Sequence, residues 1–166
     1  MEGTELVSDV HPQVQRVVDA AAAHELTLDV VEFPDGTRTA VDAAAAVGCE
    51  VGQIVKSLIF DVDGHLVLAL TSGANRVDTN ALAELAEGKH CGRADADGVR
   101  AVTGFAIGGV PPFGHAQPVR AFLDPELLTF DIVWAAAGTP RHVFPIEPAM
   151  LETIAEAVVG EFAESA

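Results

Sequence analysis

The segment from Ile54 to Thr71, IVKSLIFDVDGHLVLALT, decides the fold class of this chain. Two apolar runs flank the pair Asp63-Gly64, and an Asp-Gly pair between such runs is a strong signal for a two-residue hairpin turn. Counting back from that turn places Lys56 opposite Thr71. The segment therefore predicts an antiparallel β-hairpin with a charged residue inside its first strand.

Lys56 is one of only two lysines in the sequence. Strand alternation places it on the face of Leu58 and Phe60, whereas Ser57 falls on the other face. Two interpretations remain open. Lys56 extends to the rim of the sheet and merely solvates an edge, or it lies at the mouth of a cavity, where it contacts an anion or a carbonyl group.

The rest of the chain predicts a single domain over residues 1–166 with helices and strands interspersed. Capping residues and apolar spacing predict helices at 9–24, 39–47, 78–86, 95–102 and 148–163. Short apolar or alternating runs predict further strands at 28–33, 119–123, 130–135 and 142–146. Without regular βαβ alternation, this pattern favours an α+β fold, with a mixed, largely antiparallel sheet or barrel flanked by helices.

Residues 104–115 form a loop by composition, with four glycines and two prolines. Gly108 and Gly109 permit positive φ and close approach, so that backbone N–H groups can point at a carbonyl or phosphate oxygen. Pro111 and Pro112 stiffen the segment. A tight structural turn is the alternative interpretation. The spacing of the glycines matches neither a P-loop nor a dinucleotide-binding motif.

Charge and cysteine content limit the possible partners. The chain has 25 Asp and Glu against nine Lys and Arg, a net charge of −16. Such a surface repels polyanions in dilute buffer, and it favours a cytoplasm of very high salt, which predicts a halophilic source.

Cys49 and Cys91 lack metal-site spacing, so we expect neither a metal nor a disulfide. The absence of a signal sequence or apolar span predicts a cytoplasmic protein without membrane contact.

Four motifs together give the sequence a resemblance to a known family. They are the strand Gln53–Leu58, the segment Asn75–Asp78, the loop with its Gly108-x-x-x-Pro112 element, and Asp131 followed by Ala137-Gly-Thr-Pro140. In these motifs the chain resembles the YbaK/ProRS-associated editing domains, which are aminoacyl-tRNA deacylases related to the domain inserted in bacterial prolyl-tRNA synthetase. The resemblance implies a mixed β-barrel flanked by helices.

The resemblance also implies a site. Lys56 is expected to engage the 3′-terminal adenosine or the scissile ester of an aminoacyl-tRNA, and Gly108 and Gly109 to position the aminoacyl group. The expected substrate-binding residues around them are Ser57, Thr71, Phe105, Val110, Pro111, Pro112, His115 and Gly138. His142 is a further candidate helper, although a structural role is the simpler interpretation of either histidine. No cofactor is expected, because family members use water or substrate groups rather than a protein nucleophile.

The implied activity is hydrolysis of mischarged tRNA in trans, with Cys-, Ala- or Ser-type substrates on tRNA-Pro or a related tRNA. The partners would be the tRNA acceptor end and, in addition, an aminoacyl-tRNA synthetase. One alternative is a non-catalytic module that binds tRNA, nucleotide or a synthetase through the same pocket. Another is a small hydrolase that acts on a different ester.

Overall fold

The structure is a computed structural model that describes residues 11–33 and 39–164. Its helices are α2 (Pro12–Ala22), α3 (Ala40–Val47), α4 (Thr79–Leu85), α5 (Ala96–Thr103) and α6 (Pro148–Ala155), with 3-10 helices η1 (Val51–Gln53) and η2 (Pro125–Thr129). Its strands are β1 (Val31–Glu32), β2 (Val55–Val62), β3 (His65–Ser72), β4 (Cys91–Arg93), β5 (Arg120–Leu123), β6 (Val133–Ala136), β7 (His142–Ile146) and β8 (Val158–Val159). The α+β class is thus confirmed.

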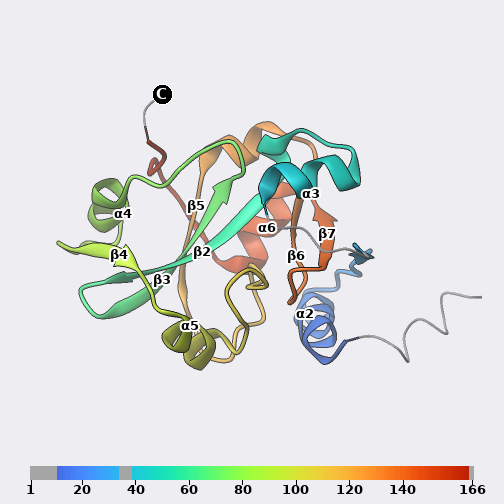
Figure 1. Cartoon of the computed structure of the whole chain (residues 1–166), viewed down its shortest axis with the longest axis horizontal. Helices are drawn as coiled ribbons and strands as arrows, with labels where there is room; N and C mark the ends of the chain where they lie inside the picture. Colours follow the sequence, from blue (N-terminus) through green and yellow to red (C-terminus); the bar gives the residue numbers. More distant parts are fainter. Residues whose placement is uncertain (1–10, 34–38, 165–166) are drawn as a thin grey trace, which may run out of the picture.

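The strands form two sheets, one in the order β4-β2-β3-β5-β8 and one in the order β1-β7-β6. Only the β3–β5 and β5–β8 pairs are parallel, so the sheet structure is mixed and largely antiparallel, as predicted. A single parallel bridge between Ile54 and Trp134 connects the two sheets. In Figure 1, β2 runs across the molecule toward β6 and β7, while α4 and α5 lie near the opposite end of the larger sheet.

The hairpin forms with the predicted register, because Val62 pairs with His65 and Lys56 pairs with Thr71. Asp63 and Gly64 both have positive φ, 52° and 92°, as a type I′ turn requires. Alternate residues of β2 enter different cores. Val55 and Ile59 belong to the main core, while Phe60 and Val62 belong to a second core beneath α4. Because β2 is covered on both faces, a ligand can reach it only along an edge.

Local capping signals explain where the helices begin and end. The Thr39 side chain accepts a hydrogen bond from the Asp42 N–H, and α3 ends at Gly48 with φ of 78°. Asp78 and Asp95 cap α4 and α5 in the same manner. The first predicted helix forms as α2, although residues 9 and 10 lie outside the described part of the chain. No helix in the described ranges is long and apolar enough to cross a membrane.

The predicted C-terminal helix over 148–163 is wrong in its second half. The helix α6 ends at Ala155, and Glu156 adopts a left-handed conformation with φ of 52°. Val158 and Val159 instead pair with β5 as strand β8, where their branched side chains are exposed. Phe162 is fully buried in the second core rather than on the face of α6. The helical spacing continued in the sequence, but backbone pairing with the edge of β5 prevails over it.

Two predicted strands are shorter than expected, because only some of their residues find a neighbouring strand to pair with. The strand predicted over 28–33 is paired only at Val31 and Glu32, which lie beside β7. The strand predicted over 130–135 begins at Val133, because the preceding residues follow the 3-10 helix η2 and a bend. Apolar residues in these segments enter the cores without joining a ladder, and Phe33 is an example.

Candidate active site

The main pocket lies where the two sheets separate. The strand β4 pairs with β2 only from Phe60 to Val62, and β6 meets the β2 side only at the bridge between Ile54 and Trp134. In the described part of the chain, no strand pairs with the β2 edge between these two points. A pocket of about 630 Å³ opens there, and it is lined by the start of α3, the edge of β2, the 107–110 segment, β6 and the turn before β7.

Lys56 lies at this edge of the sheet and is half-buried at the pocket. It is therefore both at the rim of the sheet and at the mouth of a cavity. Its Nζ donates a hydrogen bond to the backbone oxygen of Asn75 at 2.5 Å. Burial lowers the pKa of the Lys56 ammonium, Arg76 and Arg93 lower it further, and Asp124 raises it. An ammonium has three N–H donors, so the bond to Asn75 leaves capacity for a ligand.

Ser57 supplies polar groups to the same edge. Its Oγ is buried and has no hydrogen-bond partner among the described residues, and its side chain lines the pocket. Because Val62 and His65 flank a two-residue turn, the even-numbered residues of β2 exchange hydrogen bonds with β3, and the odd-numbered ones point to the other edge. The Ser57 N–H and C=O therefore face the pocket edge, where a ligand could pair with them.

Positive charge gathers at this pocket in an otherwise acidic protein. Arg76 and Arg93 line it together with Lys56, and neither arginine forms a salt bridge within the described ranges. The Arg93 guanidinium lies 5.9 Å from the centre of the Phe60 ring. Among the described residues these three cations form no salt bridge with a carboxylate, so the pocket is suited to an anionic group or a developing oxyanion.

Part of the glycine loop lines the same pocket as Lys56. Gly108 has φ of 93° and lines the pocket together with Ile107 and Val110. Gly109 is buried, and its N–H donates to the Ala106 oxygen at 2.9 Å. A Cβ on Gly109 would lie 2.8 Å from Thr139 Cα, so only glycine lets the loop approach the neighbouring backbone this closely.

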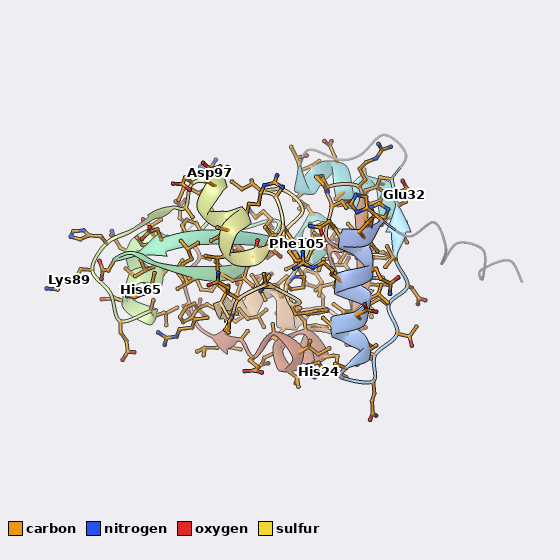
Figure 2. The ribbon with its side chains drawn as sticks, turned by 90° about the horizontal axis from the view of Figure 1, so that it is seen from below. His24, Glu32, His65, Lys89, Asp97 and Phe105 are labelled. Carbon is orange, nitrogen blue, oxygen red and sulfur yellow. The ribbon has the colours of Figure 1, made fainter. Side chains whose placement is uncertain are left out.

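Helix α2 braces the start of the same loop. The Gln13 amide and the Arg16 guanidinium both donate to the Gly104 oxygen, at 2.8 and 3.2 Å. The Arg16 guanidinium also lies 4.6 Å from the centre of the Phe105 ring. Figure 2 shows Phe105 beside this helix, and His65 and Lys89 at the far end of the molecule. The loop is therefore held by helix contacts as well as by its prolines.

A sequence model described as the aminoacyl-tRNA editing domain matches residues 34–154, which include every residue of the pocket lining. The chain belongs to the aminoacyl-tRNA editing domain family. The resemblance seen in the sequence motifs is thereby confirmed.

Known proteins show how this editing domain occurs elsewhere. A solved structure described as a candidate trans-editing enzyme for prolyl-tRNA synthetase is 46% identical, with a TM-score of 0.89 over 94% of this chain and 99% of the other. The uncharacterised protein YwhH of Bacillus subtilis (strain 168) is 30% identical over 120 residues, 72% of this chain and 76% of YwhH. A proline–tRNA ligase of Maridesulfovibrio salexigens is 34% identical over 103 residues, 62% of this chain but only 17% of the ligase.

The structure brings four of the expected site residues of this editing domain to the pocket, namely Lys56, Ser57, Gly108 and Val110. The other expected residues do not line it: Thr71, Phe105, Gly109, Pro111, Pro112, His115 and Gly138. Thr71 and Phe105 are fully buried in the protein interior. For these residues the geometry supports a packing role rather than direct contact with a ligand.

His115 lies on the far side of the glycine loop from the pocket. It lines a separate hollow of about 450 Å³ together with Pro112. Its Nε2–H donates to the Pro111 oxygen at 2.7 Å, and burial lowers the pKa of the ring. A neutral His115 thus fixes the loop as a structural hydrogen-bond donor.

Other lining residues were not among the expected site residues. Trp134, the single tryptophan of the chain, reaches the pocket from β6. Thr139 lines it beside His142, which the sequence had already named as a candidate helper, with Thr139 Oγ1 and His142 Nδ1 2.6 Å apart. Burial is the main factor that lowers the pKa of His142. The Ala137-Gly-Thr-Pro140 motif was the available signal for Thr139, but no spacing rule places Trp134 beside β2.

A metal centre is not evident at this site. In residues 11–33 and 39–164, no three His, Cys, Asp or Glu side chains lie close enough together to hold a metal ion. The polar groups that face the pocket are an ammonium, guanidinium groups, hydroxyls and an imidazole. This donor set suits binding of an anion or a polarised carbonyl group through hydrogen bonds.

Proposed function

We propose that this editing domain is a deacylase that hydrolyses the ester bond of a mischarged aminoacyl-tRNA in trans. The observation that carries the proposal is the placement of Lys56, with its ammonium, in one pocket with Ser57 and the Gly108 loop. The substrates would carry small amino acids of the Cys, Ala or Ser type on tRNA-Pro or a related tRNA. The likeness to a candidate trans-editing enzyme for prolyl-tRNA synthetase supports this choice.

The chemistry is addition of water to an ester. Water attacks the carbonyl carbon and the carbonyl oxygen becomes an oxyanion. The tetrahedral intermediate then collapses and expels the ribose oxygen, which takes up the proton that the attacking water has lost. Lys56 donates to that oxyanion or to an adjacent phosphate, and partial burial strengthens either contact. No protein nucleophile takes part, so catalysis depends on how accurately the pocket positions the ester.

The pocket walls are suited to a small side chain. Val55, Ile59 and Val110 are buried aliphatic residues that line it, and Ala136 is a further small lining residue. A hydrophobic pocket distinguishes side chains that differ by one methylene by about 1–3 kcal/mol. We therefore expect selection by size, with small residues cleaved and larger residues excluded.

The charge distribution suggests how the protein would contact tRNA and in what salt concentration it would work. Arg76 and Arg93 would contact the phosphates of the acceptor end, and the acidic remainder of the surface would stay away from the RNA. A cytoplasm of high salt is compatible with both features, because the salt screens self-repulsion. A halophilic source predicts a higher melting temperature in molar KCl than in dilute buffer, and an equal or lower one would contradict it.

A synthetase is proposed as a second partner. The matching region makes up about a sixth of the Maridesulfovibrio salexigens proline–tRNA ligase, at 17% of its length. A separate chain with the same domain would serve such a ligase from outside. Co-elution of the chain with a prolyl-tRNA synthetase and tRNA would support this partnership, and independent elution of all three would remove it.

The test of the activity is release of amino acid from Cys-, Ala-, Ser-, Thr- and Pro-tRNA in high KCl, with wild type and Lys56→Ala compared. We expect cleavage of one or more small-residue tRNAs and a large loss in the variant. Binding of tRNA without cleavage would contradict the proposal and indicate a non-catalytic module. Equal cleavage of a free amino-acid ester without tRNA would instead indicate a general esterase.

A further inference from the structure

Asp124 is a buried carboxylate next to the pocket that the chemistry above does not use. It follows β5 and is 2% exposed. Its Oδ2 accepts hydrogen bonds from the Ser72 N–H at 3.1 Å and the Asn75 side-chain amide at 2.9 Å, and its Oδ1 accepts from the Glu126 N–H at 2.9 Å. A buried carboxylate needs such donors, and here one comes from the last residue of β3 and one from the turn that follows it.

Asn75 connects this carboxylate to Lys56. Its side-chain amide donates to Asp124, and its backbone oxygen accepts the hydrogen bond from Lys56 Nζ. The segment between them is a tight turn, in which the Asn75 N–H donates to the Ser72 oxygen at 2.9 Å. Fixing the Asn75 side chain and the Ser72 backbone therefore fixes the direction of the carbonyl group that holds the ammonium.

We propose that Asp124 is the positioning residue for Lys56, and that it acts through Asn75 to hold the ammonium at the pocket edge. This inference deepens the proposed deacylase function and rests on it. Asp124 touches no reacting atom. It orients the turn whose carbonyl group holds Lys56, and it supplies a negative charge that acts on the Lys56 ammonium.

The charges around Lys56 support this arrangement. Burial and the two facing arginines, Arg76 and Arg93, disfavour the charged form of Lys56, and the Asp124 carboxylate opposes them. With Asp124 replaced by a neutral residue, the pKa of Lys56 would fall further. More of the protein would then carry a neutral amine at neutral to alkaline pH, which cannot stabilise an oxyanion.

The turn is also attached from its outer side. The Asp78 N–H donates to the Phe162 oxygen at 2.7 Å, and the Glu164 N–H donates to the Arg76 oxygen at 2.8 Å. These bonds do not involve Asp124. We therefore expect the segment to remain attached when Asp124 is substituted, so that a positioning effect can be separated from unfolding.

The chain has only two lysines, and this permits a direct measurement. Protein labelled with ¹³C at lysine Cε gives two side-chain signals, assigned with Lys56→Ala. Lys89 follows α4 and lies beside the hairpin turn, where its N–H donates to Asp63 Oδ2, so its signal is a distant internal control. The variants are Asp124→Asn and Asn75→Ala, with Glu126→Gln as the matched control, because Glu126 is an exposed carboxylate two residues away.

In Asp124→Asn we expect a lower pKa of Lys56, an unchanged Lys89 signal and an alkaline limb of the deacylation profile moved to lower pH. kcat should fall at least about tenfold, on the scale that misplacement of a reacting group costs. Asn75→Ala should shift Lys56 in the same direction, and Glu126→Gln should shift nothing. If folded Asp124→Asn or Asn75→Ala leaves both the Lys56 titration and the rate at wild-type values, the inference is wrong.

The titration also separates the two proposals. A wild-type protein that cleaves no aminoacyl-tRNA, while Asp124→Asn still lowers the pKa of Lys56, would overturn the deacylase proposal and leave the positioning role in place. If the protein cleaves aminoacyl-tRNA but neither substitution changes the Lys56 titration or the pH profile of the rate, the positioning role is wrong and the deacylase proposal remains. If Asp124→Asn fails to fold, as judged by its melting curve, Asn75→Ala decides the question.

Discussion

Substitution of Gly109 by alanine should damage the site without altering any group that faces the pocket. The added Cβ would lie 2.8 Å from Thr139 Cα, 3.0 Å from Thr139 C and 3.1 Å from the Gly138 oxygen. All three are backbone atoms, and carbon atoms in contact normally lie about 3.5–4.0 Å apart. The glycine loop and residues 138–139 must therefore move apart by roughly half an ångström or more.

The size of the effect follows from that displacement. Overpacking of this kind costs about 1–3 kcal/mol of stability, and a misplacement of about 1 Å in a catalytic site costs up to about 100-fold in rate. We expect urea unfolding to show a loss in that range and deacylation assays to show kcat/KM lowered by about 10- to 100-fold. The matched control is Gly92→Ala, because no atom lies within 4 Å of its added Cβ. Wild-type stability and activity in Gly109→Ala would show that the glycine loop and residues 138–139 are not packed this closely.

Three further predictions concern pH, the tail and a helix end. Burial, Arg76 and Arg93 lower the pKa of Lys56, so the deacylation rate should decline as pH rises through a value below the ordinary lysine pKa of about 10.4. The rate is compared after subtraction of uncatalysed hydrolysis. An increase in the rate over that pH range would identify the neutral amine as a base. Between the lowered pKa of Lys56 in the folded protein and its ordinary pKa in the unfolded chain, the unfolded chain binds more protons than the folded protein. The free energy of unfolding therefore rises with pH over this range, and the unfavourable contribution of the Lys56 ammonium to stability is relieved. Phe162→Ala, at a fully buried position, should lower the free energy of unfolding by about 3–5 kcal/mol in a urea melt, and a loss below 1 kcal/mol would show that the C-terminal segment is not docked as described. Gly48→Ala, at φ of 78° with open space around it, should lose about 1–2 kcal/mol through backbone strain alone, and no loss in the same melt would contradict the left-handed end of α3.

The features that local chemistry dictates were predictable from the sequence. The Asp63-Gly64 pair requires positive φ at both positions, and this fixed the register that places Lys56 opposite Thr71. Thr39 and Gly48 bounded α3 for equally local reasons. The approach of the glycine loop to Lys56 was an inference from family resemblance, since the two segments are about fifty residues apart.

The features that depend on distant contacts were not predictable. The end of α6 is set by backbone pairing of Val158 and Val159 with β5, which helical spacing does not encode. The pocket exists because the sheets separate beyond the Ile54–Trp134 bridge. In the sequence Asp124 resembles an ordinary helix-capping residue, and only the fold places it behind Asn75.

If the Lys56 ammonium donates to the oxyanion of the ester, its removal should slow the chemical step, and a single-turnover measurement isolates that step. Deacylation of the best small-residue aminoacyl-tRNA would be followed in molar KCl with wild type, Lys56→Ala and the control Lys89→Ala at saturating protein. Loss of one donor to an oxyanion costs about 100- to 1,000-fold, so Lys56→Ala should be slower by that factor while Lys89→Ala keeps the wild-type rate. A folded Lys56→Ala protein that cleaves as fast as wild type would contradict the account.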